Sequence, residues 1–590
     1  MKKTEQIAFF TLATMVWIYL GMRSVYVPLI HDEAVTYFTY IQSANFIPPW
    51  AYWDANNHLL NSAASALFHV LFGSSPFVIR LASWLSFLPL VFFVYRISAH
   101  FESKISKWTF IIPLLTTPFF IEFFSLTRGY GMAMAWFIGV LYFAIRYTEK
   151  PNRKTLIWIS MLGVLTSLSS LSVIVAVFVV YGWILLHQLL IQQKPLLITG
   201  IKWAVIFLLP QVPLLFYALL LKEKGLLYYG GADFIHFSLE PFARYFFNDK
   251  GLWWVVIIPF IGIVLVTGLQ IFRKTWRSLF QPASIFSFVL VLSVIAVFAQ
   301  HYVLGVNYPE DRAALYFFPL LVGTWASLAD YFNKPYFKAF LLALILWFPL
   351  DLATSFNISN SKIWINEHLP YRLNEKVNLT NKEGFPPSLS TYLLRYHIWN
   401  FNQTGAHLNA AVPNYMDYPS EWADFVLVDS NRIKKINLSD FNALDYDSIS
   451  GQTLLKRNKP NIEIFKRDTV IHDLEIRNLY TSILEFNGKT WGNKAMAMYY
   501  DLDVQPLTKE MRILIITTLF DSTGQEIFTN KFHFNEGRED WISHPNRKLK
   551  LYLPPFPENA GRFVTYIFNP ENETHKFTNV TCSLFEISHP

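Results

Sequence analysis

The sequence predicts a polytopic α-helical membrane protein followed by an extracytoplasmic region of mixed α/β and β-sandwich structure. Hydrophobic residues make up 53% of the 590 residues and charged residues only 15%, whereas soluble globular chains carry about 25% charge. Long, nearly charge-free segments recur up to residue 355 and then stop. A chain of this length also exceeds one ordinary hydrophobic core, so we expect more than one domain.

Segments of suitable length and composition to cross a membrane recur through the first part of the chain. Each is close to the roughly 20 apolar residues that cross a hydrocarbon core. The first is too long to be only a cleaved signal sequence, and no small-residue cleavage site follows it. We therefore predict about 11 spans, at residues 6–24, 76–95, 108–126, 130–147, 155–171, 172–190, 203–221, 252–272, 283–303, 312–331 and 335–353.

Basic residues near the span ends predict the topology, because cytoplasmic loops carry an excess of lysine and arginine. Lys2 and Lys3 precede the first span, which places the N-terminus in the cytoplasm. The later basic clusters fall on the same side: Arg96, Lys104 and Lys107; Arg146, Lys150, Arg153 and Lys154; Lys194 and Lys202; Arg273, Lys274 and Arg277; Lys334 and Lys338. An odd number of spans then places the C-terminal region outside a plasma or inner membrane.

Two segments of the first outer loop predict helices that lie along the membrane surface. Residues 57–72 are apolar, but a crossing there would turn the later basic clusters outward, so we place this segment on the surface. Its leucines and alanines recur at helical spacing with polar residues between them, a pattern typical of an interfacial helix. Residues 33–44 predict a second such helix, with Asp32 as its N-cap.

The pattern changes after residue 355 to mixed polar sequence with short alternating strands. We predict a membrane domain at 1–355, a mixed α/β module at 356–459 and a β-sandwich at 460–590. The clearest predicted strands are residues 422–429, 512–520, 548–553 and 562–568. Cys582 is the one cysteine, which excludes an intramolecular disulfide and a cysteine-based zinc site.

An acidic pair, Asp32 and Glu33, lies in the outer loop that directly follows the first span. A partly desolvated carboxylate at the lipid–water boundary can act as a general base or as a metal ligand. The alternative is that Asp32 caps a helix and Glu33 is a solvated acid of its first turn. The residues alone leave both interpretations open.

Two arginines lie at the outer ends of predicted spans, where a charge is costly unless it is paired or hydrated. Arg128 shares a short turn with Glu122, and Arg312 lies beside Glu310 and Asp311. The planar guanidinium group suits a phosphate ligand. The alternative is structural: an ion pair between Glu122 and Arg128 that fixes the turn, and local pairing of Arg312 at the interface.

Four histidines lie on or near the predicted outer side: His58, His69, His236 and His301. None of them forms the His-x-x-x-His or Glu-x-x-His spacing of a dedicated zinc site, so we predict no metal ligand among them. The net charge of +7 comes from bases that do not cluster on a soluble face, which argues against a nucleic-acid partner.

Several of these elements, in this order, resemble the GT-C glycosyltransferases, and more narrowly the bacterial relatives of protein O-mannosyltransferases and lipid A aminoarabinose transferase. The resemblance covers about residues 5–355. The similar elements are the acidic pair, Leu71-Phe72-Gly73 and Arg80-Leu81, the segment FSLTRGYGM around Arg128, and the segment DRAALYFFPL with Arg312 and Pro319. One departure is that Asn56-Asn57-His58 stands where the aminoarabinose transferases carry Lys-Pro-Pro, so the lysine that such relatives offer to the lipid phosphate is absent.

The resemblance implies an inverting transfer of a sugar from a polyprenyl-phosphate donor to an extracytoplasmic acceptor hydroxyl. It implies Asp32 as the base, with Glu33 orienting the base or the acceptor. A carboxylate base of this kind contributes about 10²–10⁴-fold to the rate. No cofactor is certain, although some relatives use a divalent cation.

The same resemblance assigns the residues around the leaving phosphate, whose developing charge arginine hydrogen bonds stabilise. Arg128 and Arg312 would hold the phosphate, with His58 in place of the absent lysine. The residues implied to support them are Glu122, Tyr130 and Asn57. The sugar, hexose or pentose, and the acceptor, which is a protein, a lipid or a polysaccharide, stay open.

Two alternatives come from other classes of protein. A secondary transporter would show helix-breaking Gly/Pro segments and ionisable residues near the bilayer midplane, whereas the charges here cluster at span ends. A non-catalytic glycan-binding or assembly protein would use exposed aromatic residues of the C-terminal sandwich, such as Trp491 and Trp541. The simpler interpretation of both tryptophans is that they belong to a core or a turn.

Overall fold

The computed structural model describes residues 2–588 except 49, 228, 255, 258–260, 262–263, 265–267, 269–275, 332–333, 378–383, 406–411, 417–419, 432, 506–511, 537–545 and 571. The chain divides into two compact units. The first comprises residues 1–27 and 39–363, and the second comprises residues 28–38 and 364–590. The short segment after the first helix is therefore part of the second unit, a feature that the sequence did not predict.

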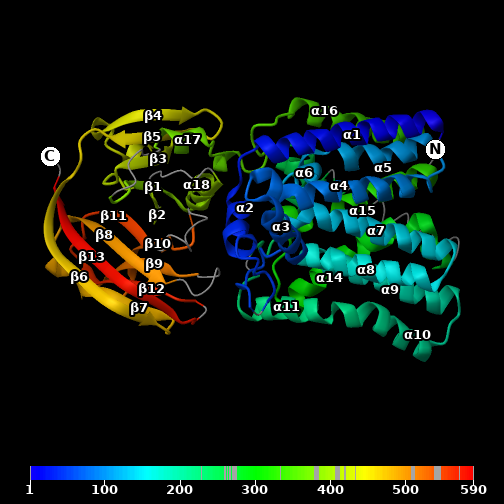
Figure 1. The fold of residues 1–590 in the computed structure, drawn as a ribbon. Coiled ribbons are helices and arrows are strands. Elements are labelled where there is room, and N and C mark those ends of the chain that lie inside the picture. Colours follow the sequence, from blue (N-terminus) through cyan, green and yellow to red (C-terminus); the bar gives the residue numbers. More distant parts are fainter. Residues whose placement is uncertain are drawn as a thin grey trace. The chain divides into compact units, whose positions relative to one another are not determined.

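The first unit is helical, and its long helices run side by side (Figure 1). Its α-helices are α1 (Lys3–Tyr26), α3 (Leu59–Phe72), α4 (Pro76–Ser98), α5 (Lys104–Thr116), α6 (Pro118–Glu122), α7 (Gly129–Glu149), α8 (Arg153–Ser169), α9 (Ile174–Leu186), α10 (Leu196–Trp203), α11 (Val212–Glu223), α12 (Glu240–Phe247), α14 (Ile285–Leu304), α15 (Phe317–Tyr331) and α16 (Pro335–Thr354).

Eight helical segments among the described residues are long and apolar enough to cross a membrane. They are Lys3–Tyr26, Pro76–Ser98, Gly129–Glu149, Leu171–Ile191, Leu196–Glu223, Ile285–Leu304, Asp311–Asp330 and Pro335–Thr354. Each corresponds to a predicted span, which confirms a polytopic helical membrane protein.

The other three predicted spans have different outcomes. The segment predicted at 108–126 is broken into α5 and α6, because Pro118 lacks the N–H that a continuous helix needs. The one predicted at 155–171 forms α8, a helix of 17 residues. The one predicted at 252–272 lies largely outside the described residues. The count of 11 spans therefore stays a prediction.

Small residues let the helices of the first unit approach closely. A Cβ atom on Gly139 of α7 would lie 2.7 Å from the ring of Phe93 in α4 and 2.9 Å from Leu162 in α8. Helices that cross a membrane commonly associate through such small residues, since lipid supplies no hydrophobic drive for helix association. Gly139 therefore sets the distance between α4, α7 and α8.

Helix α3 carries its polar side chains inward and its apolar side chains outward. Asn61 and Ser65 are buried and both hydrogen-bond the hydroxyl of Thr127, at 3.2 and 3.1 Å. Leu67 and Leu71 are 58% and 59% exposed. The segment predicted at 57–72 therefore forms a helix with an exposed apolar side, and its position along the membrane surface stays a prediction.

The second predicted surface helix, at 33–44, forms differently. Helix α2 spans His31–Thr36 and continues as a π-helical turn at Tyr37–Ile41. Asp32 is not its N-cap, as the sequence predicted. The N-cap is Ile30, and the carboxylate of Glu33 accepts the N–H of Ile30 at 3.2 Å. The prediction was wrong because a glutamate three residues after the N-cap satisfies that N–H from inside the helix.

The second unit contains helices and two β-sheets. Its further α-helices are α17 (Arg372–Lys376) and α18 (Leu393–Gly405). Its strands are β1 (Ser388–Tyr392), β2 (Val412–Met416), β3 (Phe425–Asp429), β4 (Phe441–Asp447), β5 (Gln452–Arg457), β6 (Ile462–Ile476), β7 (Tyr480–Asn487), β8 (Ala495–Gln505), β9 (Leu514–Asp521), β10 (Glu526–His533), β11 (Asn546–Leu553), β12 (Ala560–Phe568) and β13 (His575–Ser588). The four clearest predicted strands are confirmed as β3, β9, β11 and β12.

The strands form a nine-stranded sheet and a four-stranded sheet. The nine-stranded sheet has the order β4-β5-β3-β1-β2-β10-β9-β12-β7, and the four-stranded sheet has the order β11-β8-β13-β6. β1 pairs in parallel with β2 and β3, whereas the other pairs are antiparallel. The larger sheet contains strands from both sides of residue 460, where the sequence analysis placed a boundary between two modules.

The core of the β-sandwich lies between the two sheets. Met498 and Cys582 of the four-stranded sheet are buried in one cluster with Leu519 and Phe563 of the nine-stranded sheet. Trp491 packs against this cluster, so it is a partly buried core residue. Trp541 lies outside the described residues.

Candidate functional site

A cavity of about 450 Å³ lies within the first unit, among α9, α11, α14 and the loops beside them. This volume falls within the range of small-molecule sites. Most of its wall is apolar, and the contributing side chains include Leu171, Val175, Leu215, Leu219, Val297 and Leu304. Polar side chains also line the cavity, among them Asn56, His58, Tyr130, Tyr229 and Arg312.

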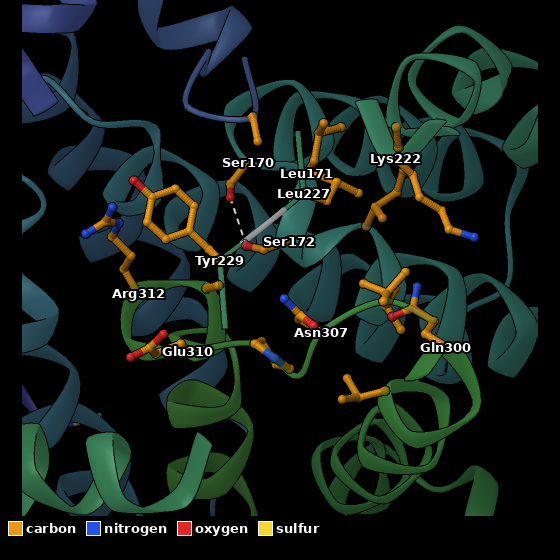
Figure 2. A pocket seen from close by; sticks show the side chains of 18 of the residues that line it. Ser170, Leu171, Ser172, Lys222, Leu227, Tyr229, Gln300, Asn307, Glu310 and Arg312 are labelled. Carbon is orange, nitrogen blue, oxygen red and sulfur yellow. Dashed lines mark hydrogen bonds between the residues drawn. The ribbon is translucent and has the colours of Figure 1, made fainter. Parts of the chain in front are cut away.

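Arg312 lies in a short 3₁₀ helix at Asp311–Ala314 that borders the cavity. Its Nε donates to the hydroxyl of Tyr130 at 3.3 Å, and its guanidinium lies 5.4 Å from the ring centre of Tyr229 (Figure 2). Asp311 has a φ of +47°, a left-handed conformation that is strained for a residue other than glycine. Aspartate and asparagine adopt this region more readily than other residues with a Cβ atom, and the turn at Asp311 directly precedes Arg312.

Arg128 is fully buried at the start of α7. Its guanidinium donates to the side-chain oxygen of Asn56 and lies 5.7 Å from the ring centre of Tyr130. Tyr130 thus contacts both arginines, one through its ring and the other through its hydroxyl. The structure brings together three residues that the sequence analysis selected: Arg128, Arg312 and Tyr130.

His58 joins the same group of side chains. Its ring packs edge-on against Tyr130, with 4.6 Å between the ring centres, and its Nδ1 lies 2.8 Å from the carbonyl oxygen of Ser169. A carbonyl oxygen only accepts hydrogen bonds, so Nδ1 carries a proton. A Cβ atom on Gly129 would overlap that carbonyl oxygen and lie 2.7 Å from Cβ of His58. Only glycine therefore fits between His58 and the end of α8.

Asn57 has a different role from its neighbour Asn56. The amide nitrogen of Asn57 donates to the carbonyl oxygen of Phe46 at 3.0 Å, and its side-chain oxygen accepts from Ser62 at 3.1 Å. These contacts hold the loop before α3. Asn56, which the sequence analysis did not select, is the asparagine that contacts Arg128 and lines the cavity.

Glu122 pairs with Arg23 and not with Arg128. Nη2 of Arg23 lies 2.7 Å from Oε1 of Glu122, and both side chains are buried, with exposures of 4% and 3%. The same oxygen accepts the backbone N–H of Lys362 at 3.1 Å. The interpretation that Glu122 forms an ion pair with Arg128 is therefore wrong. The partner of Glu122 is Arg23 of α1, which is 99 residues away in the chain.

Arg23 is a residue that the sequence analysis missed. Beyond Glu122, its guanidinium donates to the carbonyl oxygens of Asn357 and Asn360 at 2.8 and 3.1 Å. The signal was present in the sequence, since an arginine inside an apolar span needs a buried partner. Arg23 joins α1, α6 and the chain that follows α16.

Asp32 and Glu33 belong to the second unit, whereas the cavity residues belong to the first. Glu33 is fully buried and holds the start of α2 through its hydrogen bond to Ile30. The backbone carbonyl of Asp32 accepts from the hydroxyl of Thr36 at 2.7 Å, and its side chain is half-buried. The N–H of His31 donates to Glu367 at 2.7 Å, which ties α2 to the chain after residue 364.

Further polar side chains line the cavity away from Arg312. Lys222, at the end of α11, and Gln300, of α14, lie across the cavity from Arg312, and Asn307 lies between them (Figure 2). Glu310 places a carboxylate near Arg312. Lys222 and Gln300 were also missed, although a lysine that ends an apolar helix is a signal visible in the sequence.

In the described residues, one group of at least three side chains is close enough together to ligate a metal ion. It consists of His397, His533 and Glu536 and lies in the second unit. The cavity of the first unit has mostly apolar walls, and its charged and polar lining combines the guanidinium of Arg312, the ammonium of Lys222, an imidazole and tyrosine hydroxyls with the carboxylates of Glu310 and Asp311.

These observations define a multi-pass membrane protein with a polar and apolar cavity in its helical unit and a β-sandwich in its second unit. No family model matches the chain, and no curated protein matches it either.

The similarities of this chain to known proteins come from comparison with solved structures. The chain is similar to ArnT from Cupriavidus metallidurans bound to undecaprenyl phosphate, with 11% identity, a TM-score of 0.43 and coverage of 77% of this chain and 98% of that one. The apo state of that protein gives 12% identity, a TM-score of 0.43 and coverage of 77% and 97%. The arabinosyltransferase EmbB from Mycobacterium smegmatis gives 10% identity, a TM-score of 0.39 and coverage of 98% and 64%. All three TM-scores are below 0.5.

Proposed function

We propose that this protein is a membrane glycosyltransferase of the GT-C type that moves a sugar from a polyprenyl-phosphate donor to an extracytoplasmic acceptor hydroxyl. The observation that carries the proposal is the cavity in the helical unit, where Arg312 and Tyr130 border walls made mostly of apolar side chains. A lipid phosphate has the same two-part chemistry, because its head is an anion and its tail is hydrocarbon.

The phosphate interacts with the arginine part of the cavity. Arg312, which is half-buried, donates hydrogen bonds to the phosphate oxygens, and charge-assisted bonds of this kind are the stronger ones. Arg128 is fully buried against Asn56 and Tyr130, so it contributes positive charge and fixes Tyr130. His58 packs on the same tyrosine, and we propose that it takes the place of the lysine that the aminoarabinose transferases carry.

The prenyl chain lies along the apolar wall formed by α9, α11 and α14. These three helices belong to segments that are long and apolar enough to cross a membrane. A lipid-linked donor therefore reaches the cavity without leaving an apolar environment.

The transfer breaks the bond between the anomeric carbon and the phosphate oxygen while the acceptor oxygen attacks from the opposite face. The acceptor hydroxyl loses its proton to a carboxylate, and the polyprenyl phosphate leaves with negative charge that the arginines stabilise. We assign the base to Asp32. Glu33 is a positioning residue, since its carboxylate fixes the start of the helix that carries Asp32. Glu310 is the competing base, because it lines the cavity beside Arg312.

The orientation follows from the basic residues. We propose that the N-terminus is cytoplasmic and that residues after 363 are extracytoplasmic, at the outer face of a plasma or inner membrane. This orientation keeps the lysines and arginines near the span ends on the cytoplasmic side. The acceptor is a hydroxyl of a protein, a lipid or a polysaccharide.

The first test measures donor binding with undecaprenyl phosphate as the probe. The full-length protein in detergent is titrated with this lipid, and occupancy is read by native mass spectrometry. Arg312→Ala removes charge-assisted hydrogen bonds worth about 1.5–3 kcal/mol, so we expect binding to weaken about 10- to 150-fold. Arg96→Ala, which removes an exposed arginine from the last turn of α4, leaves binding unchanged. Equal binding by the Arg312 variant and the wild type would overturn the proposed phosphate site.

The second test measures turnover in liposomes. Undecaprenyl-phosphate hexose and pentose donors are supplied with a cell-envelope fraction as the acceptor source, and released undecaprenyl phosphate is quantified. Asp32→Asn should lower turnover at least about 100-fold with lipid binding intact, whereas Glu310→Gln should keep most of it. The opposite pattern would move the base to Glu310, and a wild type that consumes neither class of donor would refute the enzyme assignment.

A further inference from the structure

Three side chains of the second unit form a compact cluster that the proposed transfer does not use. His397 lies on α18, His533 ends β10, and Glu536 follows three residues later. Nδ1 of His397 lies 2.9 Å from both carboxylate oxygens of Glu536, and Nδ1 of His533 lies 3.4 Å from Oε1. One ligand atom from each residue lies within 4.8 Å of the others.

These spacings fit a shared metal ion. Ligands at about 2.1 Å from a tetrahedral zinc ion lie about 3.4 Å from one another. The distances of 2.9 and 3.4 Å in the cluster therefore need only small adjustments of side-chain torsions to admit an ion. Two imidazoles and one carboxylate match zinc and similar transition metals, whereas magnesium and calcium prefer oxygen ligands.

The three side chains are shielded from bulk water to different degrees. His397 and Glu536 are 7% and 4% exposed, whereas His533 is half-buried. A carboxylate buried this deeply is costly as an isolated charge unless a cation or hydrogen bonds compensate it.

A supporting contact orients the carboxylate. Asn400, one turn after His397 on α18, is buried and donates to Oε2 of Glu536 at 3.0 Å. Partners of this kind fix metal-binding carboxylates in position, and their loss commonly weakens metal binding about 10- to 100-fold. Asn400 therefore provides a variant that leaves all three ligands in place.

The second unit also contains a natural comparison for this cluster. His368 is 7% exposed, like His397, and its Nδ1 lies 2.8 Å from Oδ2 of the buried Asp447. The hydroxyl of Ser450 donates to the same oxygen at 2.5 Å. This pair is an ordinary buried histidine–carboxylate contact, and His368 and Asp447 are not part of a metal-ligand group in the described residues.

We propose that His397, His533 and Glu536 bind one divalent transition metal ion, with zinc as the preferred ion. Three protein ligands leave the fourth tetrahedral position for water or another group. The ring of His31 lies 5.2 Å from that of His397, so the site adjoins the helix that carries Asp32 and Glu33. The ion thereby joins α18 to the end of β10, two segments that are distant in the sequence, and lies beside α2. The site does not depend on the proposed transfer, because metal binding is measured without a donor.

The test uses the full-length protein in detergent, stripped with a chelator and then titrated with zinc against a chromophoric competitor. The wild type is expected to bind one zinc ion per chain, and cobalt in its place should give the visible absorption of a tetrahedral site. His533→Gln and Glu536→Gln should weaken binding at least 100-fold, and Asn400→Ala should weaken it about 10- to 100-fold. The matched control His368→Gln should bind zinc as the wild type does.

Folding is checked separately from metal binding. Each variant is compared with the wild type by tryptophan fluorescence and size-exclusion profile. Zinc is expected to raise the unfolding temperature of the wild type and of His368→Gln equally, that of Asn400→Ala less, and that of the two ligand variants least. His533 is half-buried, so its variant is the one that retains the fold most readily. A wild type without stoichiometric zinc at micromolar concentrations would overturn the proposal. A folded His533→Gln protein that binds zinc like the wild type would overturn it as well.

Discussion

The buried ion pair between Arg23 and Glu122 gives the sharpest prediction about stability. The two charges lie 2.7 Å apart with side-chain exposures of 4% and 3%. Coulomb attraction at this distance is about 6 kcal/mol with an effective dielectric constant of about 20, and much of it offsets the cost of removing both charges from water. Loss of one partner leaves the other charge buried and unpaired, a situation that costs about 3–5 kcal/mol.

We therefore expect Arg23→Met to destabilise the protein by about 3–5 kcal/mol. Glu122→Gln should cost slightly less, since the amide oxygen still accepts the N–H of Lys362. The double variant should lose less than the sum of the two, because it leaves no unpaired charge. Arg562→Met removes a partner from an exposed pair with Glu485 and should cost under about 1 kcal/mol.

The assay is a double-mutant cycle on unfolding free energies. Each variant is unfolded in mixed micelles by increasing amounts of a denaturing detergent, and tryptophan fluorescence reports the transition. A coupling energy of at least about 2 kcal/mol supports the buried pair. Additive single effects, or single effects no larger than that of Arg562→Met, would refute the reasoning.

Two further predictions concern the contacts beside the cavity and the second unit. Gly129→Ala should destabilise the protein by about 1–3 kcal/mol and weaken undecaprenyl phosphate binding, because its Cβ overlaps the carbonyl oxygen of Ser169. A Cβ atom on Gly182 would have no neighbouring atom within 4 Å, so Gly182→Ala should leave both stability and lipid binding unchanged. Equal effects of the two glycine variants would contradict this difference in packing. Asp447→Asn should cost about 1–3 kcal/mol at pH 7. Burial alone would raise the pKa of Asp447, but hydrogen bonds from His368 and Ser450 lower it below its ordinary value. The stability from this lowered pKa is present above about pH 3.9 and is lost as the pH falls toward the folded-state pKa. The difference in unfolding free energy between wild type and variant should therefore shrink below about pH 4, and a constant difference from pH 7 to pH 3 would contradict this assignment.

Much of the helical unit was predictable because membrane spans depend on local composition. Eight predicted spans match long apolar helices, since a segment that lies in lipid must satisfy its backbone hydrogen bonds within itself. The break at Pro118 also has a local cause. The strands of the second unit were recognisable from alternating residues, but the order in which they pair was not.

Side-chain partnerships were the least predictable part of the candidate site. The sequence suggested Arg128 as the partner of Glu122 because the two are close in the chain, whereas the fold supplies Arg23 from α1. It suggested Asn57 as a supporting residue, whereas Asn56 makes the contact with Arg128. Adjacent side chains in a loop point in different directions, and the sequence does not fix which one faces the cavity.

By itself, the sequence determined the membrane character of this protein, most of its spans and the presence of a β-rich C-terminal region, because these follow from composition and short-range periodicity. It also selected Arg128, Arg312, Tyr130 and His58 as residues of interest. Only the tertiary structure decided that Arg128, Arg312 and His58 all contact Tyr130, and that His397 meets Glu536 across 139 positions. Such contacts depend on how distant segments pack, and no local pattern of residues encodes that packing.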